Sequence, residues 1–184
     1  PATPGWPPAD LVLASYVLAE VPSAAQGACL EAALAAAQRL LVLVEPGTPA
    51  GFARIHAARA RCLAAGLTVV APCSHHATCP MHATGDWCHF AVRVPRSRRH
   101  RQLKGGTLGY EDEKFACLVV ATGGAAQMDA GTRVLRHPRV EKGFVSLELC
   151  TPDRPTRLAV TRRDPSYRAA RKTETKGKLK LQRG

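Results

Sequence analysis

Short apolar runs alternate with longer segments of helical composition in the first part of the chain. The runs at 10–16 (DLVLASY), 41–44 (LVLV) and 67–71 (LTVVA) are mainly hydrophobic, which is typical of strands buried on both faces. The segments between them are rich in Ala, Leu and Arg. This order of strand, helix, strand, helix and strand, with short connections, predicts an α/β fold with a largely parallel sheet covered by helices.

Local signals mark the ends of the two predicted helices. Ser23 is followed three residues later by Gln26, a capping-box pattern, so the first helix is expected to run from there to about Leu40. The second helix has an N-cap, a proline at its first position and a glycine at its C-terminal cap. These residues are Thr48, Pro49 and Gly66. Three arginines of this helix are expected on its outer side, namely Arg54, Arg59 and Arg61.

The second part of the chain predicts further strands and a basic end. The segment 115–121 (FACLVVA) has the composition of another buried strand, and 143–150 with 158–161 predicts a C-terminal β-hairpin. A short helix is expected from Pro165 to about Lys172. Residues 173–184 contain almost no core-forming residues and are expected to form an extended basic tail.

Three cysteines gather in the loop at 72–90, which is too rich in Pro, Gly and His for regular structure. Cys73, Cys79 and Cys88 are separated by five and by eight residues, which matches neither a zinc-finger knuckle nor a bacterial ferredoxin run. The loop therefore predicts a metal site whose fourth ligand comes from elsewhere. One alternative is structural zinc with a histidine replacing one cysteine. The candidate histidines are His75, His76, His82 and His89.

Positive charge is concentrated in two segments of a chain whose net charge is +12. No acidic residue occurs between 93 and 104, and 154–184 holds eleven basic residues against two acidic ones. Such concentration indicates a polyanion partner, most often nucleic acid, although a solvated basic face is the alternative. The expected RNA-binding residues are Arg93, Arg96, Arg98, Arg99, Arg101, Lys104, Arg162, Arg163, Arg171 and Lys172.

Composition narrows the function further. Aromatic residues make up only 5% of the chain, which favours recognition of the shape and backbone of folded RNA over stacking on single-stranded bases. Glu111, Asp112 and Glu113 are expected to neutralise nearby arginines rather than to catalyse a reaction. No apolar run approaches the ~20 residues of a membrane helix, so no membrane partner is expected. No glycine-rich nucleotide-binding loop follows a strand and precedes a helix.

Several motifs together resemble one protein family. DLVLASYVLAE, LVLVEPGTPAGF, VVAPCSHHATCP, DWCHF, RSRRHRQLKGG and YEDEKF occur in this order. They are similar to the family of methyltransferase-like protein seventeen, which comprises methyltransferase-like proteins of the mitochondrial ribosomal small subunit and their bacterial relatives. The resemblance covers roughly residues 9–170. Only the C-terminal half of the family pattern is expected here, because the N-terminal helical region and first strands are missing.

The resemblance implies a fold, a cofactor and partners. The fold would be part of a class I methyltransferase-like, Rossmann-like sheet, with residues 1–172 as the C-terminal part of that domain. The cofactor would be a [4Fe–4S] cluster, and S-adenosylmethionine is not expected to bind this chain alone. The implied cluster ligands are Cys73, Cys79, Cys88 and Cys150.

The implied partners are ribosomal RNA, small-subunit ribosomal proteins and a second chain completing the sheet. The role would be a structural component or assembly factor of the ribosomal small subunit, in the mitochondrion or, alternatively, in the bacterial cytoplasm. Two other roles stay open. One is an rRNA methyltransferase whose cofactor-binding half lies outside this chain, and the other is a zinc-stapled RNA-binding module.

Overall fold

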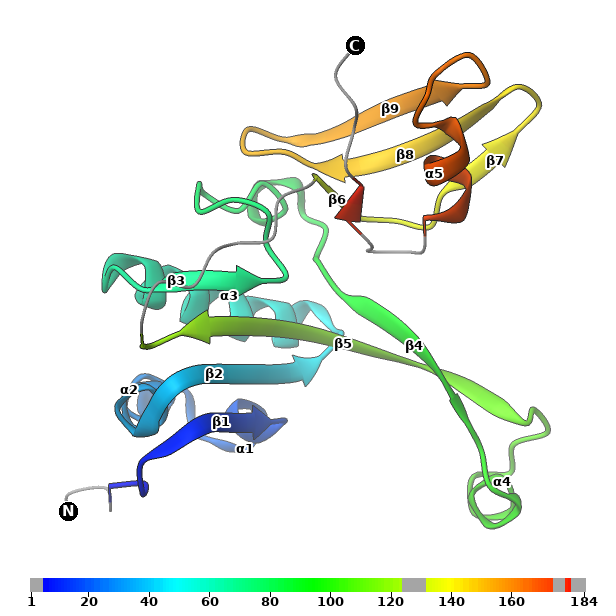
Figure 1. Ribbon diagram of the computed structural model, residues 1–184. Helices are drawn as coiled ribbons and strands as arrows, with labels where there is room; N and C mark the ends of the chain where they lie inside the picture. The colour runs from blue at the N-terminus through cyan, green and yellow to red at the C-terminus, as the bar shows by residue number, and fades with distance from the viewer. Residues whose placement is uncertain (1–4, 124–131, 174–177, 180–184) are drawn as a thin grey trace.

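The computed structural model describes residues 5–123, 132–173 and 178–179. Its strands form two sheets that lie one above the other in Figure 1. The first sheet contains β1 (Ala9–Ser15), β2 (Ala37–Pro46), β3 (Thr68–Ala71), β4 (Phe90–Pro95) and β5 (Tyr110–Ala121). The second contains β6 (Thr132–Val134), β7 (Arg139–Glu141), β8 (Phe144–Cys150), β9 (Pro155–Thr161) and β10 (Lys178–Leu179).

Five α-helices and two short 3₁₀ turns connect the strands of the described part. The helices are α1 (Val17–Glu20), α2 (Gln26–Ala36), α3 (Pro49–Ala64), α4 (Arg98–Lys104) and α5 (Tyr167–Lys172). The 3₁₀ turns are η1 (Ser23–Ala25) and η2 (His82–Thr84). No helix of the described residues is long and apolar enough to cross a membrane.

The first sheet is mixed, so the prediction of a largely parallel sheet was wrong. Its strand order is β1-β2-β5-β3, and β4 pairs with β5 outside this row. β1 and β2 pair in parallel, but β5 lies between β2 and β3 and is antiparallel to both. The three strands predicted from the alternating pattern therefore do run in one direction. The pattern could not show that a later strand would enter between two of them.

β1 lies at the edge of the sheet. Its composition predicted a strand buried on both faces, and this prediction was wrong because one face is exposed. Leu11 and Leu13 are 55% and 60% exposed, whereas Val12 and Ala14 face the core. Helices α2 and α3 pack on that core face, against buried side chains of β2 and β5 (Figure 1). The core side chains there include Leu41, Leu43, Leu118 and Val120. Each such side chain stabilises the fold by about 1.5–3 kcal/mol through burial.

The structure confirms the predicted boundaries of α3. The Thr48 hydroxyl accepts a hydrogen bond from the Gly51 amide at 3.1 Å, Pro49 occupies the first helical position, and Gly66 follows the helix with φ of +74°. The arginines of this helix are not all on its outer side. Arg59 is only 5% exposed, because it lies on the same stripe as the buried Ile55.

The predicted start and end of the preceding helix were wrong. Gln26 begins α2, but its side chain donates to the carbonyls of Leu18 and Val21 instead of closing a capping box with Ser23. The helix ends at Ala36, since the following residues belong to β2. The apolar run of that strand was recognised in sequence only from its centre onwards.

Glu45 closes the carboxyl end of β2 as a structural residue. Its side chain is 1% exposed, accepts the Leu18 amide at 3.1 Å and forms an ion pair with Arg54 at 2.7 Å. These partners satisfy a buried carboxylate that would otherwise be costly. These contacts give Glu45 a structural role at the end of β2.

The second sheet is antiparallel and has α5 on one face. β8 pairs with β9 along its whole length, and with β6 and β7 on its other edge. Alternate residues of β8, such as Val145 and Leu147, are buried in a cluster with Ala170 of α5. The predicted tail lies mostly outside the described residues, but Lys178 and Leu179 pair with β6 as β10.

β4 and the first half of β5 form an arm that projects from the body. They pair from Phe90 with Phe115 to Pro95 with Tyr110, and α4 lies at the far end (Figure 1). The remaining half of β5, up to Ala121, pairs with β2 and β3 in the sheet. The segment predicted as a basic run is thus a strand followed by a short helix. We refer to residues 90–115 as the basic arm.

Candidate functional site

The four cysteines implied as ligands come together between the two sheets. Three belong to the loop after β3, and the fourth ends β8 on the second sheet. A cavity of about 40 Å³ lies among them, with mainly apolar walls. Four thiols on the walls of one cavity are soft ligands that could bind a metal ion or an iron–sulfur cluster. The four cysteines that line this cavity are Cys73, Cys79, Cys88 and Cys150.

The cysteine loop is fixed to the body by contacts along its length. The Trp87 indole donates to the Gly47 carbonyl at 2.8 Å, which joins the loop to the turn after β2. Met81 is 1% exposed and packs with Phe52 of α3 and with Leu135. These contacts place the loop over the end of the first sheet, where its cysteines face inward.

Cys150 reaches the site because of the register of the second sheet. It is the last residue of β8, opposite Arg133 on β6 and Pro155 on β9. Its side chain joins a buried cluster with Cys79 and Cys88 packed against it. A group bound by all four thiols would therefore connect the cysteine loop directly to the second sheet.

Burial raises the thiol pKa of two of the four cysteines and so favours their protonated form. Burial, together with the neighbouring thiols Cys73, Cys88 and Cys79, raises the pKa of Cys150 to about 12. The pKa of Cys79 is raised as well, mainly by burial. A metal must displace these protons to bind, so metal affinity increases with pH.

Two buried arginines lie against the same cavity. Arg59 from α3 is 5% exposed and donates to the carbonyls of His75 and Ala77, both at 2.9 Å. Arg133 from β6 is 3% exposed and donates to the Pro72 carbonyl at 3.0 Å. Both therefore organise the cysteine loop through its backbone.

The histidines of the loop have different surroundings. His75 Nε2 lies 3.5 Å from Cys150 Sγ, and burial lowers the His75 pKa, so its ring is neutral at physiological pH. His76 contacts the Val69 carbonyl, and His82 stacks on the ring of His56. Within the described ranges, no three side chains of His, Cys, Asp or Glu are arranged to hold a single metal ion.

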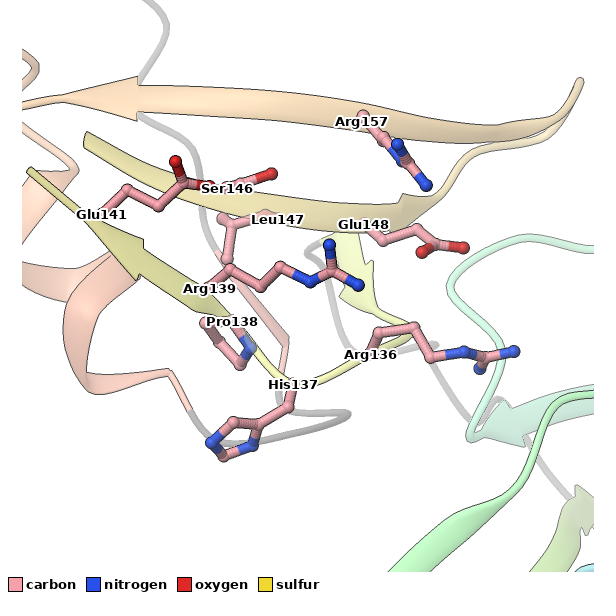
Figure 2. Close-up of a pocket in the computed structure, with 9 residues that line it drawn as sticks. All are labelled: Arg136, His137, Pro138, Arg139, Glu141, Ser146, Leu147, Glu148 and Arg157. Carbon is pink, nitrogen blue, oxygen red and sulfur yellow. The ribbon is translucent and has the colours of Figure 1, made fainter.

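A polar hollow of about 560 Å³ lies on the outer face of the second sheet (Figure 2). Its walls carry Arg139 and Arg157 but also Glu141 and Glu148, so opposite charges alternate. Arg136, at the edge of the hollow, forms an ion pair with Asp86 of the cysteine loop. This pair is a further contact between the second sheet and the loop.

Two of the predicted RNA-binding arginines are occupied by acidic partners. Arg93 pairs with Asp112 at 2.8 Å, and Arg96 with Glu111 at 2.5 Å, both across the arm. The expectation that these acids neutralise arginines is confirmed for both pairs. Lys104 lies 3.8 Å from Glu111. These ion pairs connect the two sides of the arm, and they leave the paired cations less available to bind phosphates.

Among the described residues, the other predicted cations have no acidic partner within ion-pair distance. In the part of the chain that the structure describes, no carboxylate lies within ion-pair distance of Arg98, Arg99 or Arg101, which belong to α4. Four further predicted cations lie in the turn after β9 and at the end of α5, elements that lie away from the tip of the arm (Figure 1). These are Arg162, Arg163, Arg171 and Lys172, all of them exposed.

Sequence reasoning missed the buried arginines beside the four cysteines. Arg59 was assigned to the outer side of α3, although its spacing from Phe52, Ile55 and Cys62 is that of one helical stripe. That spacing was a usable signal. Arg133 carried no signal, because its place opposite Cys150 depends on strand pairing across the second sheet.

One comparison with known proteins identifies the family. A family model described as mitochondrial small ribosomal subunit Rsm22 matches residues 3–178. The match spans nearly the whole chain and agrees with the resemblance that the sequence motifs carried. No curated protein matches the chain.

Proposed function

Because the chain belongs to the family described as mitochondrial small ribosomal subunit Rsm22, we propose that it is an RNA-binding structural component or assembly factor of that subunit. The observation that carries this proposal is the basic arm, which projects from the body and presents cations at its end (Figure 1). The family supports a role at the ribosome in the mitochondrion. The arm supports ribosomal RNA as the direct partner.

The arm has the features of a backbone-reading RNA contact. Arg98 and Arg99 are exposed and Arg101 is half-buried, so three guanidinium groups near one short helix can reach phosphates. Arginine binds phosphate oxygens in a planar, bidentate manner. Phosphate contacts of this kind position a protein on folded RNA without reading bases.

The tip of the arm also presents apolar side chains. Leu103 is 79% exposed and Leu108 is 57% exposed. Large hydrophobic side chains exposed on a projecting element favour its burial in an assembly. This supports the proposal that ribosomal proteins as well as RNA cover the arm.

The four thiols fit the [4Fe–4S] cluster that the resemblance implies. Four soft sulfur ligands suit either a cluster or zinc. The four cysteines line one cavity, and the family resemblance favours the cluster over zinc. We propose that Cys73, Cys79, Cys88 and Cys150 bind this cluster. A bound cluster would supply strong iron–thiolate bonds, and the protein would use them to fix the cysteine loop against β8.

A sedimentation experiment tests the ribosomal role. The full chain and an Arg98→Gln/Arg99→Gln/Arg101→Gln variant are expressed in mitochondria, and lysates are fractionated on sucrose gradients. The wild-type chain should cosediment with the small subunit or its precursors, and the variant should shift to light fractions. A wild-type chain that stays in light fractions throughout would contradict the proposal.

Metal analysis tests the cluster separately. Protein purified without oxygen should contain iron and sulfide in equal amounts and absorb visible light, and Cys150→Ser should lose both. Cys29→Ser is a matched control, since Cys29 belongs to α2 and does not line the cavity of the four cysteines. Zinc without sulfide would replace the cluster with a structural metal and leave the RNA contact untouched.

An rRNA methyltransferase is a second candidate, supported by the bare edge of β1. β1 is the end strand of the described sheet, so further strands from another chain could pair with its free edge and complete the sheet. Calorimetry with S-adenosylmethionine distinguishes the two roles. Binding by the chain together with a partner would favour the enzyme, and no binding by either would favour the structural role.

A further inference from the structure

Two buried guanidinium groups beside the cysteines have N–H groups without partners in the described structure. These are Nε of Arg59, and Nε and one terminal nitrogen of Arg133. Each arginine uses other N–H groups to bind loop carbonyls. A buried charged donor without an acceptor is costly, so its presence in a native structure requires an explanation.

Both arginines lie where a group bound by the thiols would lie. Arg59 and Arg133 line the same cavity as the four cysteines. Arg133 is the cross-strand neighbour of Cys150, and its guanidinium lies 4.1 Å from the ring centre of Phe90, which forms another part of the wall. The two cations enter from different elements, α3 and β6.

We infer that Arg59 and Arg133 are positioning residues that stabilise an anionic iron–sulfur cluster with their charge and their N–H groups, an inference that rests on the proposed cluster. A cluster ligated by four thiolates is an anion, and the two guanidiniums place positive charge against it. Their unpartnered N–H groups find acceptors in its sulfur atoms. The cost of burying two cations is offset by the same contact.

The positive charge of the two arginines would change the reduction potential of the cluster. Reduction adds one negative charge, and nearby positive charge stabilises the reduced form, so it raises the reduction potential. Removing one guanidinium charge therefore makes the cluster harder to reduce. A purely structural contact to the loop backbone would not change the potential in this charge-dependent way.

The test compares charge-removing and charge-keeping variants in the full chain, purified without oxygen. Arg133→Gln and Arg59→Gln remove the charge, and Arg133→Lys and Arg59→Lys keep it. Arg61→Gln is the matched control, because Arg61 lies on the same helix as Arg59 but is 59% exposed. Iron, sulfide, circular dichroism and a spectroscopic redox titration are measured for each variant.

The glutamine variants should reduce the equilibrium constant for one-electron reduction by about tenfold, which is about 59 mV. The lysine variants should shift it less, and Arg61→Gln should not shift it. Loaded glutamine variants with wild-type potentials would overturn the inference while leaving the cluster in place. Wild-type protein without iron and sulfide would instead remove the proposed cluster itself and the inference with it.

The lysine variants decide the matter if the glutamine variants do not bind the cluster. Arg133→Lys that binds iron and sulfide, but loses them to a chelator faster than wild type, supports the inference because charge is kept while fixed donors are lost. Arg133→Lys with a wild-type circular dichroism spectrum and no cluster would overturn it, since charge would then not be what stabilises the site.

Discussion

Neutralising the three unpartnered arginines of α4 should change how RNA binding depends on salt. We consider Arg98→Gln/Arg99→Gln/Arg101→Gln, which removes cations near the tip without touching the ion pairs along the arm. Each phosphate contact contributes roughly one unit to the slope of log affinity against log salt. The triple variant should therefore lose roughly three units of slope.

The expected change in slope corresponds to a measurable change in RNA affinity. When salt rises from about 50 to about 200 mM, a difference of about three units of slope corresponds to about a 60-fold difference in affinity loss. At low salt the triple variant should bind much more weakly than wild type, and at high salt the two should approach each other. Fluorescence anisotropy with a folded small-subunit rRNA fragment measures both curves.

The matched control breaks an ion pair instead of removing an unpartnered cation. Arg93→Gln/Asp112→Asn keeps the net charge of the arm and deletes the pair that links β4 with β5. Its salt slope should equal that of wild type. The reasoning is refuted if the triple variant keeps the wild-type slope, or if the control loses as much slope as the triple variant.

Three further outcomes are expected. Gly51→Ala should destabilise the fold by roughly 1–3 kcal/mol in urea unfolding, because a Cβ there would meet the Pro46 carbonyl oxygen at 1.9 Å; a loss below about 0.5 kcal/mol would contradict this. The hydrogen bond from Arg96 holds the pKa of Glu111 below its ordinary value of 4.5. The pair therefore stabilises the arm fully above about pH 4.5, and this stabilisation is lost as the pH falls through the lowered pKa. Amide exchange of the arm, corrected for intrinsic rates, should accelerate there relative to β2, and unchanged exchange down to about pH 2 would oppose it. Cys150→Ser or iron chelation should accelerate exchange in the cysteine loop and β8 together, and acceleration in only one of them would count against a shared metal.

Much of the first sheet could be predicted from local pattern. The buried centres of β2, β3 and β5 are continuous apolar runs, and the caps of α3 follow from Thr48, Pro49 and Gly66. What the pattern could not supply was the order of strands. The place of β5 between β2 and β3 is a contact between segments far apart in the chain, and no local signal encodes it.

The candidate site divides in the same way. Clustering in one loop was enough to select Cys73, Cys79 and Cys88 as ligands, whereas Cys150 was chosen by family resemblance alone. The charge run was enough to select the arm. The charge run could not show that Arg93 and Arg96 would form ion pairs, because their acidic partners lie on β5 and come close only when β4 pairs with β5.

β5 is a single strand of 12 residues that serves both the arm and the centre of the sheet. A pull along the arm would load its bonds with β2 and β3 in shear, where several hydrogen bonds must break at once. A sideways pull on α4 would instead unzip β4 from β5 one pair at a time, ending at Phe90 and Phe115, whose rings stack at 5.2 Å next to the cysteine loop. The mechanical resistance of this protein should therefore depend strongly on direction.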